Sequence, residues 1–211
     1  MIPAKDEWYK ALEEKQGAEV QQKLSQATIA ICGCGGLGSN IALMLARAGV
    51  KKLILIDFDK VEITNLHRQV YKPTQIGKPK AEALVENLKE YAPYVEYEAY
   101  VAKVSPENIS SLAKDADIVC EAFDKANAKA MLVNAVLEKL PQKYLVAASG
   151  MAGYKEANLI KTRRVSEKFY FCGDFSSDVN DGIGLISSRV MICAAHQAHA
   201  IIRILCRKFD A

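Results

Sequence analysis

A glycine-rich loop followed by two acidic residues is the part of the sequence best suited to chemistry. The loop places glycine at four of six consecutive positions, Gly33, Gly35, Gly36 and Gly38. Glycine leaves room where a backbone turns and approaches a phosphate, and a helix that follows such a loop presents free N–H groups to the anion. Asp57 and Asp59 close the next apolar run, where a carboxylate can reach ribose hydroxyls. The pattern predicts a nucleotide site; the alternatives are a tight turn without a ligand and solvated carboxylates.

A second group of polar side chains follows the acidic residues, and it helps to distinguish between nucleotides. The group consists of Asn65, Arg68, Gln69 and Lys80. Arg68 offers a planar fork of donors and Lys80 a movable point charge, and both suit phosphate oxygens. A redox enzyme has little use for two cations beside its nucleotide, whereas an enzyme that splits ATP does. Each residue taken singly could be an ordinary surface residue, so the prediction of ATP depends on their occurring together.

One further carboxylate follows a later apolar run and suggests a metal ion. Asp124 comes just after the predicted strand 117–122, at the edge of a parallel sheet where ligands bind. A carboxylate close to phosphates is favourable mainly when a divalent cation lies between the two charges. Mg²⁺ is usually held by one or two carboxylates together with phosphate oxygens. We therefore predict Mg²⁺ as a cofactor, with Asp124 as its ligand.

Apolar periodicity predicts the elements that position these residues. Strands are expected over residues 27–32, 52–57, 95–101, 117–122 and 144–148. Helices are expected over residues 6–22, 37–48, 78–91 and 126–140, and a last helix ends at residue 205. Because short buried strands alternate with helices, we predict an α/β fold: a Rossmann-like, doubly wound, mostly parallel sheet with helices on both faces.

Two polar regions are expected to be loops. The segment from the second strand to residue 76 is long for a connection and is therefore predicted to be functional, and residues 166–181 are predicted to be mostly loop. We expect a single domain over residues 1–211, in which an N-terminal helical segment, 1–26, precedes a nucleotide-binding core, 27–211.

Composition limits the class of protein. The 211 residues carry 28 basic and 25 acidic side chains without a basic block, so nucleic acid is not an expected partner. The six cysteines form no C-x-x-C pair, which favours free thiols in a reducing compartment. No apolar signal opens the chain, and charged residues interrupt its longest apolar stretch, 183–205. We expect a soluble cytoplasmic protein with no membrane partner.

Three segments, 33–42, 55–69 and 76–81, together resemble the ThiF/MoeB/HesA family of adenylyltransferases, which activate ubiquitin-like sulfur carrier proteins. The short chain is most similar to the ThiF branch of thiamine biosynthesis. The resemblance implies that Arg68, Lys80 and Asp124 are catalytic, with Asp124 also binding Mg²⁺. The cofactor-binding residues would be Gly33, Gly35, Gly36, Gly38, Asp57, Asp59, Asn65 and Gln69.

The same resemblance implies a reaction and partners. The C-terminal glycine carboxylate of a small carrier ending in Gly-Gly would attack the α-phosphorus of ATP, giving an acyl-adenylate and pyrophosphate. That carboxylate has an ordinary pKa of about 3.5, so it needs no general base. A homodimer is also expected. The alternatives are an ATP-dependent tRNA-nucleoside dehydratase of the same fold, a non-catalytic nucleotide-binding module, and an NAD-dependent oxidoreductase.

The sequence departs from the family in three respects. Family members usually supply an arginine from the N-terminal segment, but the first arginine here is Arg47, and Lys15 is the nearest substitute. Larger members bind zinc through two C-x-x-C pairs; none occurs here, so we predict no structural zinc. Some relatives use a loop cysteine in a covalent link, and Cys172 is the one comparable residue, although its context also suits a strand end. His196 and His199 are expected to flank a packed helix rather than bind metal.

Overall fold

The computed structural model describes residues 2–178, 182 and 184–210. The strands are β1 (Thr28–Cys32), β2 (Lys52–Ile56), β3 (Glu96–Tyr100), β4 (Ile118–Glu121), β5 (Tyr144–Ala148), β6 (Lys161–Arg164) and β7 (Phe169–Gly173). The α-helices are α1 (Lys5–Gln16), α2 (Ala18–Leu24), α3 (Gly36–Arg47), α4 (Lys80–Tyr91), α5 (Ile109–Leu112), α6 (Ala126–Lys139) and α7 (Ser187–Leu205). Short 3₁₀ turns cover Ile63–Asn65, Pro73–Gln75 and Ala157–Leu159.

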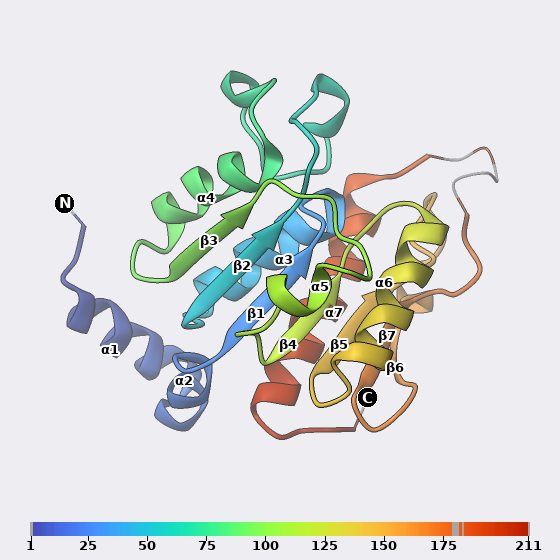
Figure 1. Ribbon diagram of the computed structural model, residues 1–211. Coiled ribbons are helices and arrows are strands. Elements are labelled where there is room, and N and C mark those ends of the chain that lie inside the picture. Colours follow the sequence, from blue (N-terminus) through green and yellow to red (C-terminus); the bar gives the residue numbers. More distant parts are fainter. Residues whose placement is uncertain (1, 179–181, 183, 211) are drawn as a thin grey trace.

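The strands form one seven-stranded sheet in the order β3-β2-β1-β4-β5-β7-β6 (Figure 1). All neighbours are parallel except β6, which runs antiparallel to β7 at the edge. The chain proceeds outward from β1 to β2 and β3, and then returns to place β4 on the other side of β1. The order therefore reverses between β1 and β4, and this is the point at which doubly wound sheets bind ligands.

Helices cover both faces of the sheet, as the predicted fold class requires. Side chains alternate along β1, so that Ile29 and Ile31 pack in one apolar cluster with α3, α4 and α7. Ala30 and Cys32 face a second cluster that includes Ile109 of α5 and residues of α6. Burial on both faces explains why β1 and β2 are nearly continuous apolar runs. The two layers are visible on either side of the sheet in Figure 1.

The expected N-terminal helix over residues 6–22 is wrong as a single element. Gly17 has φ of 89°, a left-handed conformation that ends α1 at Gln16 and lets α2 begin at Ala18. Helix-forming residues on both sides hide this break from a count of propensities, because glycine inside a helical pattern is only a weak signal.

The region 166–181, expected to be mostly loop, contains one strand that was not predicted, β7. Tyr170 and Cys172 are buried while Phe169 and Phe171 are half-buried, so β7 is an alternating strand beside β5. Strand β6 was not predicted, because its sequence, Lys-Thr-Arg-Arg, is basic and largely exposed at the edge of the sheet. Residues 179–181 of the expected loop lie outside the described residues. None of the helices that the structure describes is long and apolar enough to span a bilayer.

Candidate nucleotide-binding site

The glycine loop makes a turn between β1 and α3 that only glycine can form at two positions. Gly33 has φ of 98°, and a Cβ atom there would lie 2.7 Å from the carbonyl oxygen of Ala122. A Cβ atom at Gly38 would lie 1.8 Å from the carbonyl oxygen of Gly33. No side chain caps the start of α3 at Gly36, so the helix presents its N-terminal N–H groups and positive dipole end to the cavity.

Asp57 ties the end of β2 to the glycine loop. Its Oδ2 accepts a hydrogen bond from the backbone N–H of Cys34 at 2.6 Å, and its Oδ1 accepts one from Asp59 at 2.8 Å. Burial raises the pKa of Asp57, and these two hydrogen bonds oppose the rise because they favour the carboxylate. The side chain also lines the cavity, where its remaining lone pairs are available to a ligand.

Lys80 is held in the cavity by Asp59. The Lys80 ammonium lies 3.0 Å from the Asp59 carboxylate, and the Lys80 side chain is only 9% exposed. The backbone N–H of Lys80 also donates to the carbonyl oxygen of Asp59 at 2.8 Å. These contacts fix the start of α4 against the end of β2. Both residues were predicted as cofactor-binding or catalytic, and the structure joins them as a pair.

The loop that contains the first 3₁₀ turn brings Asn65, Arg68 and Gln69 into the same cavity. Asn65 is buried, and its Oδ1 accepts a hydrogen bond from the backbone N–H of Glu62 at 3.0 Å, which fixes the turn. Within the described residues, Arg68 Nε and Gln69 Oε1 are buried and have no hydrogen-bond partner. Buried polar atoms without partners are costly, so these two atoms are suited to a polar ligand.

Arg68 and Asp124 interact electrostatically although they come from different loops. Burial lowers the pKa of Arg68, and the negative charge of Asp124 raises it. The two side chains also line the same cavity. The structure therefore brings the predicted metal ligand near the predicted phosphate-binding arginine.

The cavity has a volume of about 630 Å³. It lies at the ends of β1, β2 and β4. Its lining includes every predicted site residue except Gly38: Gly33, Gly35, Gly36, Asp57, Asp59, Asn65, Arg68, Gln69, Lys80 and Asp124. Gly38 instead packs beneath the loop against Gly33, so its role is to allow the turn. Val104, Phe123 and Met131 give the cavity an apolar part as well.

Three positioning residues were missed by the sequence analysis. Asn40, in α3, donates to the carbonyl oxygens of Gly36 at 2.7 Å and Arg68 at 3.0 Å, and so joins the glycine turn to the arginine loop. The Tyr71 hydroxyl donates to the carbonyl oxygen of Cys34 at 2.6 Å. A polar residue inside an otherwise apolar helix was the available signal for Asn40, whereas no local pattern marks Tyr71.

The third missed residue, Glu121, fixes the segment that carries Asp124. Its side chain is fully buried and accepts hydrogen bonds from the backbone N–H of Phe123 at 2.7 Å and from Lys129 at 3.1 Å. Burial raises the pKa of Glu121, and the Lys129 charge opposes the rise. The carboxylate thus connects the end of β4 to α6. Its two partners, Phe123 and Lys129, precede and follow Asp124 in the chain.

Two other candidates lie away from this cavity. Cys172 is fully buried in β7, where burial raises the pKa of its thiol to about 12. Its environment is that of a structural cysteine, since reactive cysteines have lowered pKa values and are accessible. Lys15 is exposed on α1 and does not line the cavity of its own chain. Among the described residues, no group of three or more His, Cys, Asp or Glu side chains is arranged around a metal position.

The fold and the cavity together define the class: a doubly wound α/β protein with a cation-lined cavity at the point where the strand order reverses. The chain belongs to the ThiF family, whose pattern matches residues 9–210. This confirms the predicted family and fold class.

Two curated proteins are similar to part of this chain. A sulfur carrier protein adenylyltransferase of Thermus thermophilus is 37% identical over 109 residues, 51% of this chain and 40% of that protein. An adenylyltransferase and sulfurtransferase (uba4) of Aspergillus clavatus is 39% identical over 136 residues, 64% of this chain and 27% of that protein. The chain thus spans two-fifths or less of the length of these curated relatives.

Solved structures extend the likeness to the whole chain. The crystal structure of the E. coli tRNA N6-threonylcarbamoyladenosine dehydratase TcdA in complex with ATP matches with a TM-score of 0.85 and 20% identity. The match covers 99% of this chain and 98% of that one. At this identity, the likeness establishes the fold.

Proposed function

We propose that the protein is an adenylyltransferase that uses ATP and Mg²⁺ to activate the C-terminal glycine of a small, ubiquitin-like sulfur carrier protein. The observation that carries the proposal is the convergence of Arg68, Lys80 and Asp124 on one cavity beside the glycine turn. The names of the Thermus and Aspergillus relatives support the same activity. The unpartnered Arg68 Nε and Gln69 Oε1 support a polar occupant such as a triphosphate.

In the proposed reaction, the residues of this chain position and neutralise phosphate. The carrier carboxylate is ionised at neutral pH and attacks the α-phosphorus; the bond to the β-phosphate oxygen breaks, and pyrophosphate leaves with its electron pair. Arg68 and Lys80 would stabilise the charge on the phosphate oxygens, and Asp59 holds Lys80 in place. Mg²⁺, held by Asp124, would supply further charge neutralisation. Asp57 would bind the ribose, and Val104, Phe123 and Met131 offer an apolar wall to the base.

Several finer proposals rest on the resemblance to the short ThiF branch. The carrier would end in Gly-Gly, and the pathway would be thiamine biosynthesis in the cytoplasm. All six cysteines are free, which suits a reducing compartment. A homodimer is proposed because both sheet edges, β3 and β6, lack a neighbour among the described strands. In such a dimer Lys15, exposed on α1, could reach the partner's cavity.

A second candidate is ATP-dependent dehydration of a modified tRNA nucleoside. One observation favours it: this chain covers nearly the full length of the E. coli dehydratase, but only 27–40% of the two carrier-activating relatives. The two candidates share the nucleotide site and differ in the acceptor. They can therefore be separated only by an assay in which the acceptor is varied.

The experiment is ATP–pyrophosphate exchange with Mg²⁺ and a small carrier protein ending in Gly-Gly. The acceptor controls are the same carrier without its last glycine, and unfractionated tRNA. The protein controls are Arg68→Ala and, as a matched exposed cation on α4, Lys89→Gln. We expect exchange that needs the intact carrier terminus, is abolished by Arg68→Ala and is unchanged by Lys89→Gln. The carrier proposal would be overturned in favour of the second candidate if the carrier supported no exchange while tRNA stimulated the formation of AMP or ADP.

A further inference from the structure

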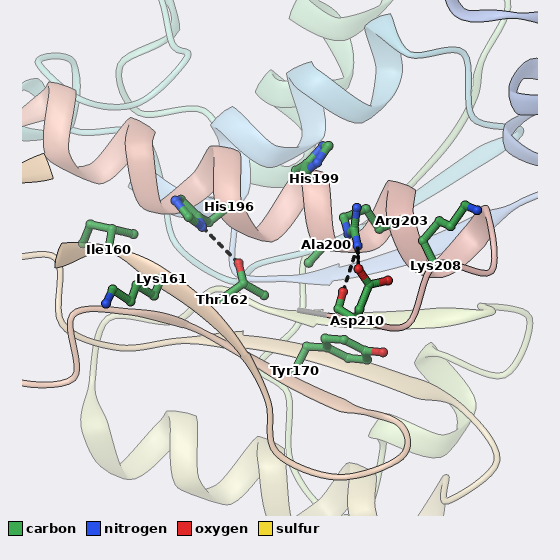
Figure 2. A pocket seen from close by; sticks show the side chains of 10 residues that line it. All are labelled: Ile160, Lys161, Thr162, Tyr170, His196, His199, Ala200, Arg203, Lys208 and Asp210. Carbon is green, nitrogen blue, oxygen red and sulfur yellow. Dashed lines mark hydrogen bonds and ion pairs between the residues drawn. The ribbon is translucent and has the colours of Figure 1, made fainter. Parts of the chain in front are cut away.

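A second cavity, of 470 Å³, lies between α7 and the edge strand β6, away from the nucleotide site. Figure 2 shows α7 on one side and β6 and β7 on the other, with Thr162 and His196 directed toward each other across the space between them. We refer to it as the α7–β6 groove. Its charged and hydrogen-bonding lining includes Lys161, Thr162, His196, Arg203, Lys208 and Asp210.

The walls of the groove are held in place by contacts to the C-terminal segment. The Tyr170 hydroxyl donates to the carbonyl oxygen of Phe209 at 2.9 Å, and the Phe209 ring stacks on Tyr144 with centroids 6.0 Å apart. Arg203 pairs with the Asp210 carboxylate at 2.8 Å. The segment that carries Lys208 is therefore fixed against the sheet, so the groove is a preformed feature of the fold.

The groove carries an excess of positive charge. Lys161, Arg203 and Lys208 contribute three positive charges and Asp210 one negative charge, which leaves +2 before the histidines are counted. Asp210 pairs with Arg203, and within residues 2–178, 182 and 184–210 no carboxylate lies within ion-pair distance of Lys161 or Lys208. Both lysine charges are thus available to an anion.

Neutral hydrogen-bonding groups lie beside the cations. Thr162 Oγ1 and His196 Nδ1 are 3.0 Å apart and form a hydrogen bond across the groove (Figure 2). Lys161 and His196 lie toward one end of the groove, and Arg203 and Lys208 toward the other (Figure 2). Because His196 and Arg203 are seven residues apart on one helix, the ends are separated by roughly 10 Å.

We propose that the α7–β6 groove binds a small, extended polyanion of the polyphosphate class. Cations at both ends match an anion whose charge is spread along its length, and a single compact ion would engage only one end. The volume is in the range of about 300–1,000 Å³ that is typical of small-molecule sites. The proposal is independent of the activity proposed for the nucleotide cavity, because the two sites share no lining residue.

The test is isothermal titration with inorganic tripolyphosphate. Every protein titrated, including the one called wild type, carries Arg68→Ala, which weakens phosphate binding at the nucleotide cavity without adding a second polyphosphate. The buffer contains about 0.15 M KCl so that diffuse attraction is screened. The variants are Lys161→Gln combined with Lys208→Gln, and Lys89→Gln as a matched exposed lysine on α4, which packs against β3 at the opposite edge of the sheet from β6. We expect one saturable site in the wild type and in Lys89→Gln, and affinity at least about tenfold weaker in the double variant.

The three histidines of the chain provide a second readout. His196 and His199 line the groove, whereas His67 contacts the carbonyl oxygen of Leu185 beside the nucleotide cavity. In imidazole NMR spectra, tripolyphosphate should shift the signals of His196 and His199 and leave those of His67 unchanged. Three results would each overturn the proposal. The first is a shift of the His67 signals alone, and the second is binding that the double substitution leaves unchanged. The third is a short RNA that competes at lower concentrations than tripolyphosphate.

Discussion

The carboxylates of the nucleotide cavity differ in what already binds them. Asp57 accepts backbone hydrogen bonds on both of its oxygens, and Asp59 is paired with Lys80. Asp124, by contrast, acts on Arg68 through its charge. This difference suits Asp57 and Asp59 to organising the cavity, and Asp124 to binding an ion that arrives with the nucleotide.

Asp124→Ala should therefore lower the rate of adenylation by about a hundredfold, which corresponds to ~2.7 kcal/mol of transition-state stabilisation. The measurement is ATP–pyrophosphate exchange over a range of Mg²⁺ concentrations, with Asp124→Asn as the isosteric variant. Nucleotide binding in the absence of Mg²⁺ should change little. Full exchange activity in Asp124→Ala would rule out the metal role.

Cys172→Ala should retain exchange activity within about twofold, because the thiol is buried and its pKa is raised to about 12. Cys206→Ala, at the partly exposed end of α7, is the matched variant. Both are assayed below the temperature at which the variants unfold, because removing a buried sulfur also destabilises the core. A large loss of sulfur transfer in Cys172→Ala alone would show that the thiol takes part in the chemistry.

At the scale of elements, a buried ion pair joins the end of β7 to the start of α7. Asp174 and Arg189 are 2.6 Å apart, and their side chains are 1% and 3% exposed. Arg189 also donates to the carbonyl oxygens of Lys155 and Glu156. The pair thus holds three segments together close to Val190 and Leu185, which line the nucleotide cavity.

Arg189→Ala should destabilise the protein by about 3–5 kcal/mol, because it leaves the Asp174 charge buried without its partner. Arg203→Ala is the matched control: its pair with Asp210 is largely exposed to solvent, so its loss should cost much less than the loss of the buried pair. The free energy of unfolding is measured with urea. Equal effects of the two substitutions would contradict the assignment of a buried pair.

The same pair predicts a dependence of stability on pH. Burial by itself would raise the pKa of Asp174, but hydrogen bonds from Ser177, Ser176 and Arg189 outweigh it and hold the pKa below its usual range. The stabilisation is therefore complete above the unfolded-state pKa of about 3.9 and is lost as the pH falls below it. The difference in unfolding free energy between wild type and Asp174→Asn should shrink below about pH 4. A difference that stays constant down to pH 2.5 would contradict the lowered pKa.

At the scale of the whole molecule, the nucleotide cavity joins the ends of β1, β2 and β4 to loops from both halves of the sheet. A ligand bound there stabilises all of these contacts together. ATP at about 100 times its Kd should therefore add about 2.7 kcal/mol to the unfolding free energy and raise Tm by roughly 5–10 °C. Differential scanning calorimetry with ATP and NAD at equal concentrations measures the effect. An equal or larger shift with NAD would favour the oxidoreductase alternative.

Much of the fold and site could be predicted because its signals are local in the sequence. The run before Gly33 is apolar because β1 is buried on both faces. Arg68 lies in the connection between β2 and α4, and Lys80 is the first residue of α4. The spacing of the glycines depends on a turn within six residues, so it is readable without knowledge of the rest of the chain. These features led to the correct fold class and family, and to a set of residues that the structure gathers in one cavity.

Tertiary structure decided the features that depend on distant partners. Strand β6 is a strand because it pairs with β7, not because its basic sequence favours one, and Glu121 is significant only because β4 brings its carboxylate against α6. The α7–β6 groove likewise joins residues from 160 to 210 that no local spacing relates. The sequence by itself determined the nucleotide loop and its strands, since periodicity and turn chemistry act over a few residues. Only the folded chain determined the edge strand, the buried ion pairs and the second cavity, because burial and charge pairing act between residues far apart in the chain.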